Sequence, residues 1–401
     1  MTEKKLNTKN NKNLPPINWV ETTLGKVIKI GRGSSPRPIQ NYIVEKKGIP
    51  WVKIADATAS RSRYIEKTKE FIKEEGRSTS VSPGDLIVSN SATPGIPKFM
   101  KIEACVHDGW LVFSEYKNLD KLYLYYFFLD YRIRLERSAF GTVFKNLTTE
   151  IVRSVPIFLP PLREQKAIAS LLSAYDDKIE LLKYQNKTLE EIGQVIFQEW
   201  FGKYELDDFI KVQEILEFEK GVEIGSNNYF VNKNDLEKPE MFYRVGDIAN
   251  NGNNSSIYCE KDLLKGKIFK NDDVLVSFDG TVGRVFIGGN GGYSSGIRKI
   301  FDKNVNIKNS FLYFWAKSEQ VQETINLYSE GTTIQHAGRS IPYLEIISNR
   351  ENIDEITESL NPVFIKILEN LNQIRILSSA RDEILPKLMS GIVRVNDFSS
   401  N

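Results

Sequence analysis

The 401-residue sequence predicts a mixed fold of the α/β (α+β) class, in which two similar globular halves alternate with two long helices that pair as an antiparallel coiled coil. Three observations predict this fold. Short motifs recur at an offset close to 190 residues, two segments repeat apolar residues every seven positions, and the Gly, Pro and aromatic content falls where each of these segments begins. The chain therefore reads as globular, helix, globular, helix.

The internal repeat is clearest at two motifs. Leu86-Ile87-Val88-Ser89 matches Val274-Leu275-Val276-Ser277, within β-branched runs at residues 81–89 and 273–287 that predict strands. Ser138-Ala139-Phe140-Gly141-Thr142 matches Tyr328-Ser329-Glu330-Gly331-Thr332. Before each Gly-Thr pair, residues 119–137 and 310–328 carry apolar residues at helical spacing, so we predict one helix there in each half.

The two long helices are predicted to begin at about Leu162 and about Glu351. Each carries an apolar seam in alternating steps of three and four, and such sustained seven-residue spacing is typical of a coiled coil. The first seam runs through Ile168, Leu172, Tyr175, Ile179, Leu182, Asn186, Leu189, Gly193 and Ile196. The second runs through Ile353, Ile356, Leu360, Val363, Ile367, Asn370, Ile374, Leu377, Arg381, Ile384 and Leu388. Asn186 and Asn370 would fix the register if buried; the alternative is that one or both rotate out to solvent.

Composition excludes several classes of protein. No stretch approaches the roughly 20 apolar residues of a membrane span, and the Lys/Asn-rich leader lacks the apolar core of a signal peptide. Cys105 and Cys259 are too few for a disulfide framework or a multi-cysteine zinc site. His107 and His336 are isolated, which leaves little basis for a histidine-rich metal site or a histidine-based triad. We therefore expect a reduced, cytoplasmic protein that is not associated with a membrane.

Charge is distributed unevenly along the chain. The formal net charge is +2, but residues 1–160 carry a balance of +10 and residues 203–347 a balance of −4. A basic first third fits binding to phosphate groups. The alternative is a solvated surface that happens to be rich in lysine.

Several strings resemble those of one known family. Leu159-Pro160-Pro161-Leu162-Arg163-Glu164-Gln165-Lys166-Ala167-Ile168-Ala169, continuing through Asp176-Asp177-Lys178-Ile179-Glu180 to Phe197-Gln198-Glu199-Trp200-Phe201, resembles the central conserved region of type I restriction-modification specificity subunits. Arg381-Asp382-Glu383-Ile384-Leu385-Pro386-Lys387-Leu388-Met389-Ser390-Gly391 resembles the distal conserved region of that family. Val276-Ser277-Phe278-Asp279-Gly280-Thr281-Val282-Gly283-Arg284 and the Gly-Thr pairs resemble its recognition-domain motifs.

Two stretches depart from the pattern. The second globular half ends in Ile346-Ile347-Ser348-Asn349-Arg350, without the Pro-Pro-Leu-x-Glu-Gln entry of the first. The first half has Ser91-Ala92-Thr93-Pro94-Gly95 where the second has Gly-Thr-Val-Gly. The second departure indicates that the two halves read different DNA sequences.

The resemblance implies a domain plan and a set of partners. The plan is a flexible basic leader (1–16), a first target-recognition domain (17–160), a central conserved helix (161–202), a second target-recognition domain (203–347), a distal conserved helix (348–395) and a tail (396–401). Each recognition domain is expected to read one half of a bipartite, asymmetric target in double-stranded DNA. The helices are expected to set the half-site spacing and to dock two adenine methyltransferase (modification) subunits, which recruit restriction/translocase subunits. The chain itself is expected to bind no cofactor, with S-adenosylmethionine, ATP and Mg belonging to the partners.

The sequence does not predict the active site of an enzyme. Asn361-Pro362-Val363-Phe364 lacks the second Pro of an adenine methyltransferase motif, and Val363 belongs to the helical seam. Gly31-Arg32-Gly33-Ser34-Ser35-Pro36 has Pro where a dinucleotide loop needs its third Gly. Asp176-Asp177-Lys178 has the composition of a metal-dependent nuclease, but adjacent helical positions point to different sides and Glu180 and Lys183 continue a solvated face. No Gly-x-x-x-x-Gly-Lys-Ser/Thr phosphate loop occurs.

Base edges are read best by Arg, Asn, Gln, Lys and Ser on exposed loops. The candidates in the first half are Arg32, Ser34, Ser35, Arg37, Arg61, Arg63, Asn90, Ser91 and Lys145. The candidates in the second half are Asn227, Asn228, Asn251, Asn253, Arg284, Arg298 and Gln335. For each of them the alternative is an ordinary turn-forming role.

These observations predict a non-catalytic DNA specificity subunit that takes part in defence against foreign DNA. The alternative is a standalone two-headed DNA-binding or regulatory protein that has the same fold but no active nuclease complex.

Overall fold

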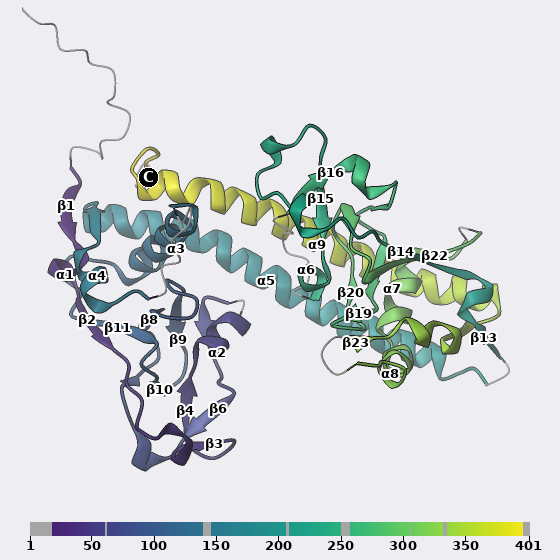
Figure 1. The fold of residues 1–401 in the computed structure, drawn as a ribbon, viewed down its shortest axis with the longest axis horizontal. Helices are drawn as coiled ribbons and strands as arrows, with labels where there is room; N and C mark the ends of the chain where they lie inside the picture. The colour runs from purple at the N-terminus through teal and green to yellow at the C-terminus, as the bar shows by residue number, and fades with distance from the viewer. Residues whose placement is uncertain are drawn as a thin grey trace, which may run out of the picture. The chain divides into compact units, whose positions relative to one another are not determined.

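The computed structural model describes residues 18–60, 62–138, 146–205, 208–249, 257–304, 306–331 and 335–395 (Figure 1). The leader expected at residues 1–16 and the tail expected at 396–401 lie outside these ranges. The chain divides into two compact units, residues 1–180 with 378–401 and residues 181–377. The sheet-rich part of each unit is called a head below: the first head runs from β1 to β12 and the second from β13 to β24.

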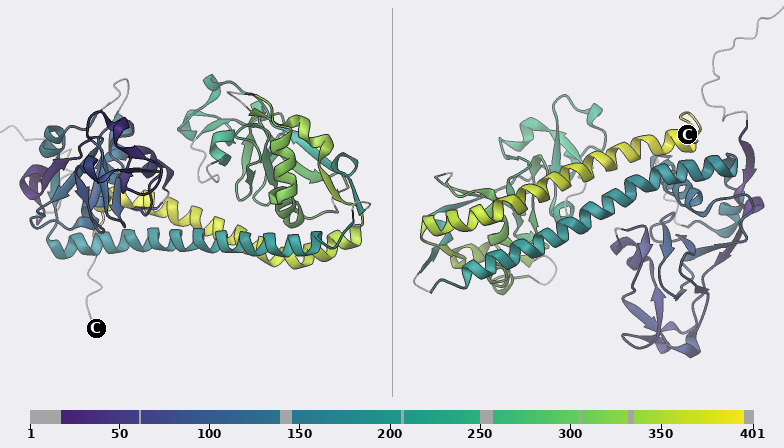
Figure 2. Two further views of the ribbon diagram at one scale, coloured as in Figure 1. Left: turned by 90° about the horizontal axis from the view of Figure 1, so that it is seen from below. Right: turned by 180° about the vertical axis from the view of Figure 1, so that it is seen from behind.

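Two 40-residue helices, α5 (Leu162–Phe201) and α9 (Arg350–Met389), contribute to both units. In the first unit, Ile168 and Leu172 near the start of α5 share a core with Leu385 and Leu388 near the end of α9. In the second unit, the end of α5 shares a core with the start of α9. The helices therefore pack antiparallel, as the heptad spacing predicts (Figures 1 and 2).

The two asparagines of the seams are buried within the second unit. Asn186 is 7% exposed and Asn370 is 1% exposed, and the Asn370 Nδ2 donates to Oδ1 of Asn186 at 2.8 Å. Asn186 in turn donates to the carbonyl of Ile367 at 3.3 Å. Of the two alternatives, burial is confirmed, and the register role of this pair stays a prediction.

The first head contains two five-stranded sheets and a two-stranded ribbon. The inner sheet has the order β2-β11-β8-β9-β5, with strands Lys29–Arg32, Trp110–Ser114, Leu86–Ser89, Pro97–Met100 and Tyr64–Ile65. The outer sheet has the order β3-β6-β4-β10-β7, with strands Ile43–Val44, Glu70–Ile72, Ile49–Val52, Ala104–Val106 and Ser80–Val81. The ribbon pairs β1 (Val20–Thr23) with β12 (Pro156–Leu159). The helices are α1 (Leu24–Val27), α2 (Ile54–Ala59), α3 (Lys121–Ser138) and α4 (Thr149–Ser154), with short 3-10 turns at Ile39–Asn41 and Glu74–Gly76.

The second head repeats this plan with four strands in each sheet and one more two-stranded ribbon. Its inner sheet has the order β14-β22-β18-β20, with strands Leu216–Lys220, Ile297–Asp302, Val274–Ser277 and Val285–Phe286. Its outer sheet has the order β16-β15-β21-β17, with strands Tyr258–Glu260, Pro239–Tyr243, Gly291–Tyr293 and Ile268–Phe269. Two ribbons pair β13 (Phe209–Lys211) with β24 (Glu345–Ile347) and β19 (Asp279–Gly280) with β23 (Gln335–His336). The helices are α6 (Val245–Ala249), α7 (Asn309–Lys317) and α8 (Glu319–Leu327), with 3-10 turns at Val212–Glu214, Ser226–Asn228, Lys233–Asp235, Lys261–Leu264 and Gly338–Tyr343.

One element differs from its predicted form. The continuous helix expected over residues 310–328 is two helices, α7 and α8, because Ser318 between them adopts an extended backbone (φ −63°, ψ 149°). The Ser318 hydroxyl donates to the carbonyl of Trp315 at 2.7 Å, which satisfies an acceptor at the end of α7. The first head keeps one 18-residue helix, α3, at the equivalent place.

Each head is tied to the start of the helix that follows it. In the first unit the buried amide of Gln165 accepts from the backbone N–H of Asp120 and donates to the carbonyls of Asn118 and Pro160, all at 2.9 Å. In the second unit, which lacks the Pro-Pro-Leu-x-Glu-Gln string, Arg350 Nη1 donates to Oδ2 of Asp302 at 2.7 Å. Both contacts join the loop that precedes the helix packed on the inner sheet to the first turn of a long helix. The second unit, whose sequence differs from the family pattern here, therefore makes the same connection with an ion pair.

Asp302 also organises its own loop, because its carboxylate accepts from the backbone N–H groups of Asn304, Asn306 and Ile307 at 3.0 Å each. Its burial by itself would raise the pKa of the carboxyl. The hydrogen bonds from Arg350 and these backbone amides outweigh that effect and lower the pKa of Asp302 to about 2.

We expect Asp302→Asn to lower the free energy of unfolding by about 2–3 kcal/mol at pH 7, because the folded state holds the charged carboxylate more tightly than the unfolded chain does. A carboxyl whose pKa is lowered by folding stabilises the folded state at pH values above its pKa in the unfolded chain, which is near 4. This contribution to stability is lost as the pH falls from about 4 to about 2. Thermal melts of the full chain check this, with Glu383→Gln as the control, because the Glu383 side chain is 74% exposed and its pair with Lys387 is a surface contact. A loss that is equal at pH 7 and pH 2 would contradict the ionic origin.

Candidate nucleic-acid interface

Both heads contain the same tight turn after the central strand of the inner sheet. In the first head, the Ser89 hydroxyl donates to the carbonyl of Thr93 and accepts from the N–H of Ile96 at 2.8 Å, while the N–H of Gly95 donates to the carbonyl of Ser89 at 2.8 Å. Ser89 is fully buried, so these bonds are shielded from water.

The second head builds this turn with a different sequence. The buried Ser277 hydroxyl donates to the carbonyl of Thr281 and accepts from the N–H of Arg284 at 2.9 Å, and Gly283 N–H donates to the Ser277 carbonyl at 2.8 Å. Gly95 and Gly283 both have a positive φ, of 88° and 75°. Ser91-Ala92-Thr93-Pro94-Gly95 and Asp279-Gly280-Thr281-Val282-Gly283 are therefore one structural element with two sequences. We name it the serine turn.

Each serine turn pairs with a second loop. Ser91 forms an antiparallel bridge with Asn146, and Leu147 N–H donates to the Asn90 carbonyl at 2.7 Å. In the second head, Asp279 pairs with His336, and Ala337 N–H donates to the Phe278 carbonyl at 2.7 Å. The side chains of Asn146 and His336 are exposed, so both loops present polar groups to solvent beside the turn.

Two further loops of each head approach each other closely through their backbones. A Cβ on Gly33 would lie 2.0 Å from the carbonyl oxygen of His107, and one on Gly221 would lie 2.2 Å from that of Tyr293. Only glycine fits at such contacts. Gly33 in the Gly-Arg-Gly-Ser-Ser-Pro string is thus required by packing, which is a reason unrelated to nucleotide binding.

The same two loops are joined by a hydroxyl–carboxylate hydrogen bond whose partners are exchanged between the heads. In the first head, Ser35 Oγ donates to Oδ1 of Asp108 at 2.9 Å. In the second head, Ser295 Oγ donates to Oε2 of Glu223 at 3.0 Å. The carboxylate therefore lies on one loop in the first head and on the opposite loop in the second.

The first-head candidates gather around the serine turn. Arg32 ends β2, is 59% exposed, and donates through Nε to the carbonyl of Asp108 at 2.8 Å. Asn90 is 5% exposed and also donates to the Asp108 carbonyl, at 3.1 Å. Arg32, Asn90 and Asn146 line a cavity of about 180 Å³. Ser34 lies beside Thr79 with 2.9 Å between their hydroxyl oxygens, and Arg37 is exposed.

The second-head candidates divide into two groups. Gln335 is exposed on β23, where its backbone pairs with Gly280 of the turn, and the exposed Arg284 follows the turn directly. Arg298 is half-buried and donates through Nη1 to the carbonyl of Ser295 at 2.6 Å, and desolvation lowers the pKa of its guanidinium. Asn227 and Asn228 form a separate 3-10 turn, in which the Asn228 amide donates to the carbonyl of Ile224. Four candidates, Arg61, Lys145, Asn251 and Asn253, lie outside the described residues.

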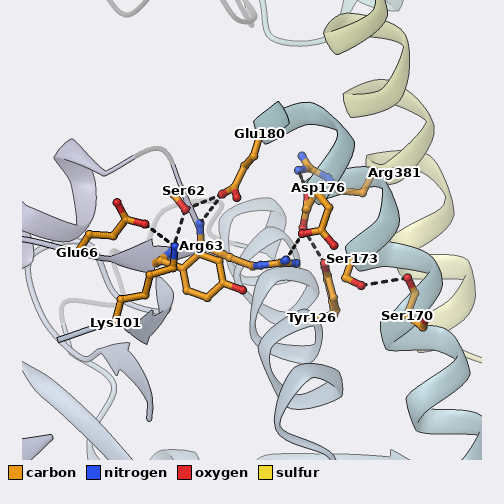
Figure 3. Close-up of polar contacts among 12 residues, drawn as sticks. Ser62, Arg63, Glu66, Lys101, Tyr126, Ser170, Ser173, Asp176, Glu180 and Arg381 are labelled. Carbon is orange, nitrogen blue, oxygen red and sulfur yellow. Dashed lines mark hydrogen bonds and ion pairs between the residues drawn. The ribbon is translucent and has the colours of Figure 1, made fainter. Parts of the chain in front are cut away.

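Arg63 occupies a different environment from the other candidates. Its side chain is 8% exposed and pairs with Asp177 of α5, while its backbone N–H and the hydroxyl of Ser62 both donate to Oε1 of Glu180 (Figure 3). This arginine therefore fastens the first head to the helix. The solvated face expected at Glu180 is wrong, because this carboxylate is half-buried and bonded to the head.

Asp176 is the centre of a second fastening. It accepts from the Tyr126 hydroxyl of α3 at 2.7 Å and from Arg381 of α9 at 2.6 Å (Figure 3). Asp176 and Asp177 thus serve as ion-pair partners within the first unit. Among the described residues, no group of three or more His, Cys, Asp or Glu is placed to hold a metal ion, and no described helix is long and apolar enough to cross a membrane.

The architecture is that of a two-headed scaffold, with related polar turns on each head and an antiparallel helix pair. A model of the type I restriction modification DNA specificity domain matches residues 16–191 and 203–341. The chain therefore belongs to the type I restriction-modification DNA specificity family, whose members are non-catalytic specificity subunits. This confirms the family and the expectation that the chain is not an enzyme.

Two relatives and one solved structure span nearly the whole chain. The MjaIX specificity subunit of Methanocaldococcus jannaschii is 26% identical, covering 96% of this chain and 95% of the relative. The MjaVIII specificity subunit of the same organism is 22% identical, covering 96% and 95%. The crystal structure of a type I restriction-modification S subunit from M. genitalium has the same fold, with a TM-score of 0.52 and 16% identity over 96% of this chain and 98% of that one.

The sequence-based search missed Asp108, Glu223, Asp279 and Ser295, which shape both loops around the turn. The signal that could have found them is the repeat itself. Extending the offset of the Ser89 and Ser277 strands aligns Ser91 with Asp279, and the offset of the Gly-Thr pairs aligns Asn146 with His336. Aspartate and glutamate were left out because base recognition favours Arg, Asn and Gln.

We expect Ser277→Ala to speed hydrogen exchange across residues 277–284 about tenfold or more, because the Arg284 N–H loses its buried acceptor, at a cost of roughly 1–3 kcal/mol. Ser89→Ala should do the same across residues 89–96 and leave the second turn unchanged. Exchange measured by mass spectrometry on the full chain tests both variants, with Ser173→Ala on α5 as the control. Unchanged exchange in both turns would show that the serine hydroxyls do not hold them.

Proposed function

We propose that this chain is the subunit that gives a type I restriction-modification complex its DNA specificity, with each head reading one half of a bipartite, asymmetric target in duplex DNA. The observation that carries the proposal is the serine turn. Both heads hold this turn in one backbone geometry and place different polar side chains on it. A shared frame with different exposed groups is suited to reading two different half-sites.

Polar and basic groups around the two turns support a role in contacting DNA. In the first head, Arg32, Ser34, Ser35, Arg37, Asn90, Ser91 and the neighbouring loop at Asn146 fit base-edge or phosphate contacts. In the second head, Arg284, Arg298, Gln335, Asn227 and Asn228 have the same chemistry. Arg61, Lys145, Asn251 and Asn253 are proposed from sequence alone. Arg63 is not proposed to contact DNA, because its side chain pairs with Asp177 of α5.

The helices are proposed to set the half-site spacing and to dock two adenine methyltransferase subunits, which recruit the ATP-driven restriction/translocase subunits. We propose that those partners bind S-adenosylmethionine, ATP and Mg. We also propose that the complex is cytoplasmic. The proposed plan retains the target-recognition domains at 17–160 and 203–347 and the helices at 161–202 and 348–395. The bonds that tie each head to a helix start support a fixed attachment of each head.

One face of α5 in the second unit fits the docking role. Leu181, Tyr184, Ile192 and Val195 are 48%, 69%, 46% and 63% exposed. At about 100° per residue these four positions fall within one side of the helix. Exposed apolar side chains that share one face of a helix are typical of a protein–protein interface, and we call these four residues the stripe.

We expect deletion of the gene to abolish N6-methyladenine at one split motif in the source genome, because the methyltransferase loses its specificity subunit. Single-molecule methylation mapping with and without the gene reads out the motif directly. Restoring the gene should restore the same motif. An unchanged methylome from an expressing strain would contradict the proposal and favour a standalone DNA-binding protein.

We expect Tyr184→Ala combined with Val195→Ala to reduce co-purification of the methyltransferase subunits about tenfold or more, because buried interface aromatic side chains often contribute 2 kcal/mol or more. The exposed Lys187→Ala, outside the stripe on the same helix, is the matched control. Alanine favours helix, so circular dichroism should be unchanged in each variant. Full retention of the partner by the double variant would remove this face from the interface.

A further inference from the structure

The loop pairs beside the two serine turns carry different chemistry at equivalent positions. The first head has Ser91 beside Asn146, two neutral side chains that both donate and accept hydrogen bonds. The second head has Asp279 beside His336, with 2.7 Å between Oδ1 of Asp279 and Nδ1 of His336. Position for position, the second head therefore replaces a neutral pair with a carboxylate held by an imidazole.

The fold does not require this carboxylate–imidazole pair. The backbone of the turn is fixed by the Ser277 hydroxyl, by the bond from Ala337 N–H to the Phe278 carbonyl, and by bonds in both directions between Glu330 and His336. The side chains of Asp279 and His336 are 27% and 63% exposed, and ion pairs at such exposure contribute little to stability. The presence of this pair where the turn begins is therefore better explained by contact with a ligand.

Electrostatics limits what that ligand group can be. A carboxylate repels the phosphates of DNA, so Asp279 weakens general attraction wherever the turn approaches the backbone. An ionised carboxylate is a hydrogen-bond acceptor only, and it fits the exocyclic amino groups in the major groove. The guanidinium of Arg298 lies close enough to Asp279 to interact with its charge.

We propose that Asp279 reads an exocyclic amino group, cytosine N4 or adenine N6, at one position of the half-site bound by the second head. His336 is a positioning residue that holds the carboxylate in its reading orientation. The inference rests on the proposed function, because it places the second head on DNA. Ser91 and Asn146 occupy the same place in the first head, where their neutral groups suit a different base.

The test is selection of binding sites by the full-length chain, with its methyltransferase partners, from a library of random duplexes. Asp279→Leu keeps the approximate size of the side chain but removes the acceptor, so it should reduce the preference for the amino-bearing base about tenfold to a hundredfold at one position. The other half of the motif should stay unchanged. The identity of the selected base in the wild-type motif separates cytosine from adenine.

Two further readouts separate base reading from a structural role. Asp279→Asn should bind scrambled duplexes more tightly than the wild type, because a negative charge near the phosphates is removed. His336→Ala should relax selectivity at the same position, and His336→Asn, which introduces the residue type found at Asn146, should restore part of it. Asp262→Asn removes another exposed carboxylate of the second head, paired with Lys238 at 3.1 Å, and should leave the motif intact.

A motif unchanged by Asp279→Leu would overturn the inference. So would a loss of binding by this variant to all duplexes alike. If the wild-type complex itself selects no split motif, the proposed function fails, and that outcome is distinct from a split motif that does not respond to position 279.

Discussion

Each unit depends on one connection, the polar contact between the end of the inner sheet and the first turn of a long helix. Gln165 makes this connection with three hydrogen bonds of one buried amide, and Asp302 makes it with Arg350 and three backbone amides. A buried polar group costs free energy unless every bond is made, so these contacts are sensitive to geometry. They hold each head in a defined orientation on its helix, which a reader of DNA sequence needs.

The acidic residues near the middle of α5 extend this role. Asp176, Asp177 and Glu180 have the composition of a catalytic cluster, yet all three carboxylates are engaged with Tyr126, Arg381, Arg63 or Ser62 (Figure 3). The family strings in this region are thus explained by packing. These strings include the residues that attach the first head to the helices.

The architecture could be predicted from the sequence because periodicity and repetition are properties of many residues at once. The start of α9 at Arg350 was expected within one residue, since the seam beginning at Ile353 fixes the helical phase. The residues of the candidate interface were harder to predict from the sequence, because it is formed by loops that lie side by side in the fold but far apart in the chain. Arg63 illustrates the limit: an arginine in a polar loop fits a DNA contact, and only the fold reveals that Asp177 lies beside it. The break at Ser318 was missed because one residue changes conformation while the apolar spacing continues.

The exchanged hydrogen bond between Ser35 and Asp108 in one head and Ser295 and Glu223 in the other has an evolutionary consequence. Transferring a single loop between the heads would bring together two hydroxyls or two carboxylates, and the second combination is repulsive. If the heads read DNA as proposed, a new specificity is obtained more readily by moving a whole head, or by paired changes in both loops, than by exchanging one loop at a time. This hydrogen bond therefore restricts which loops can be combined within one head.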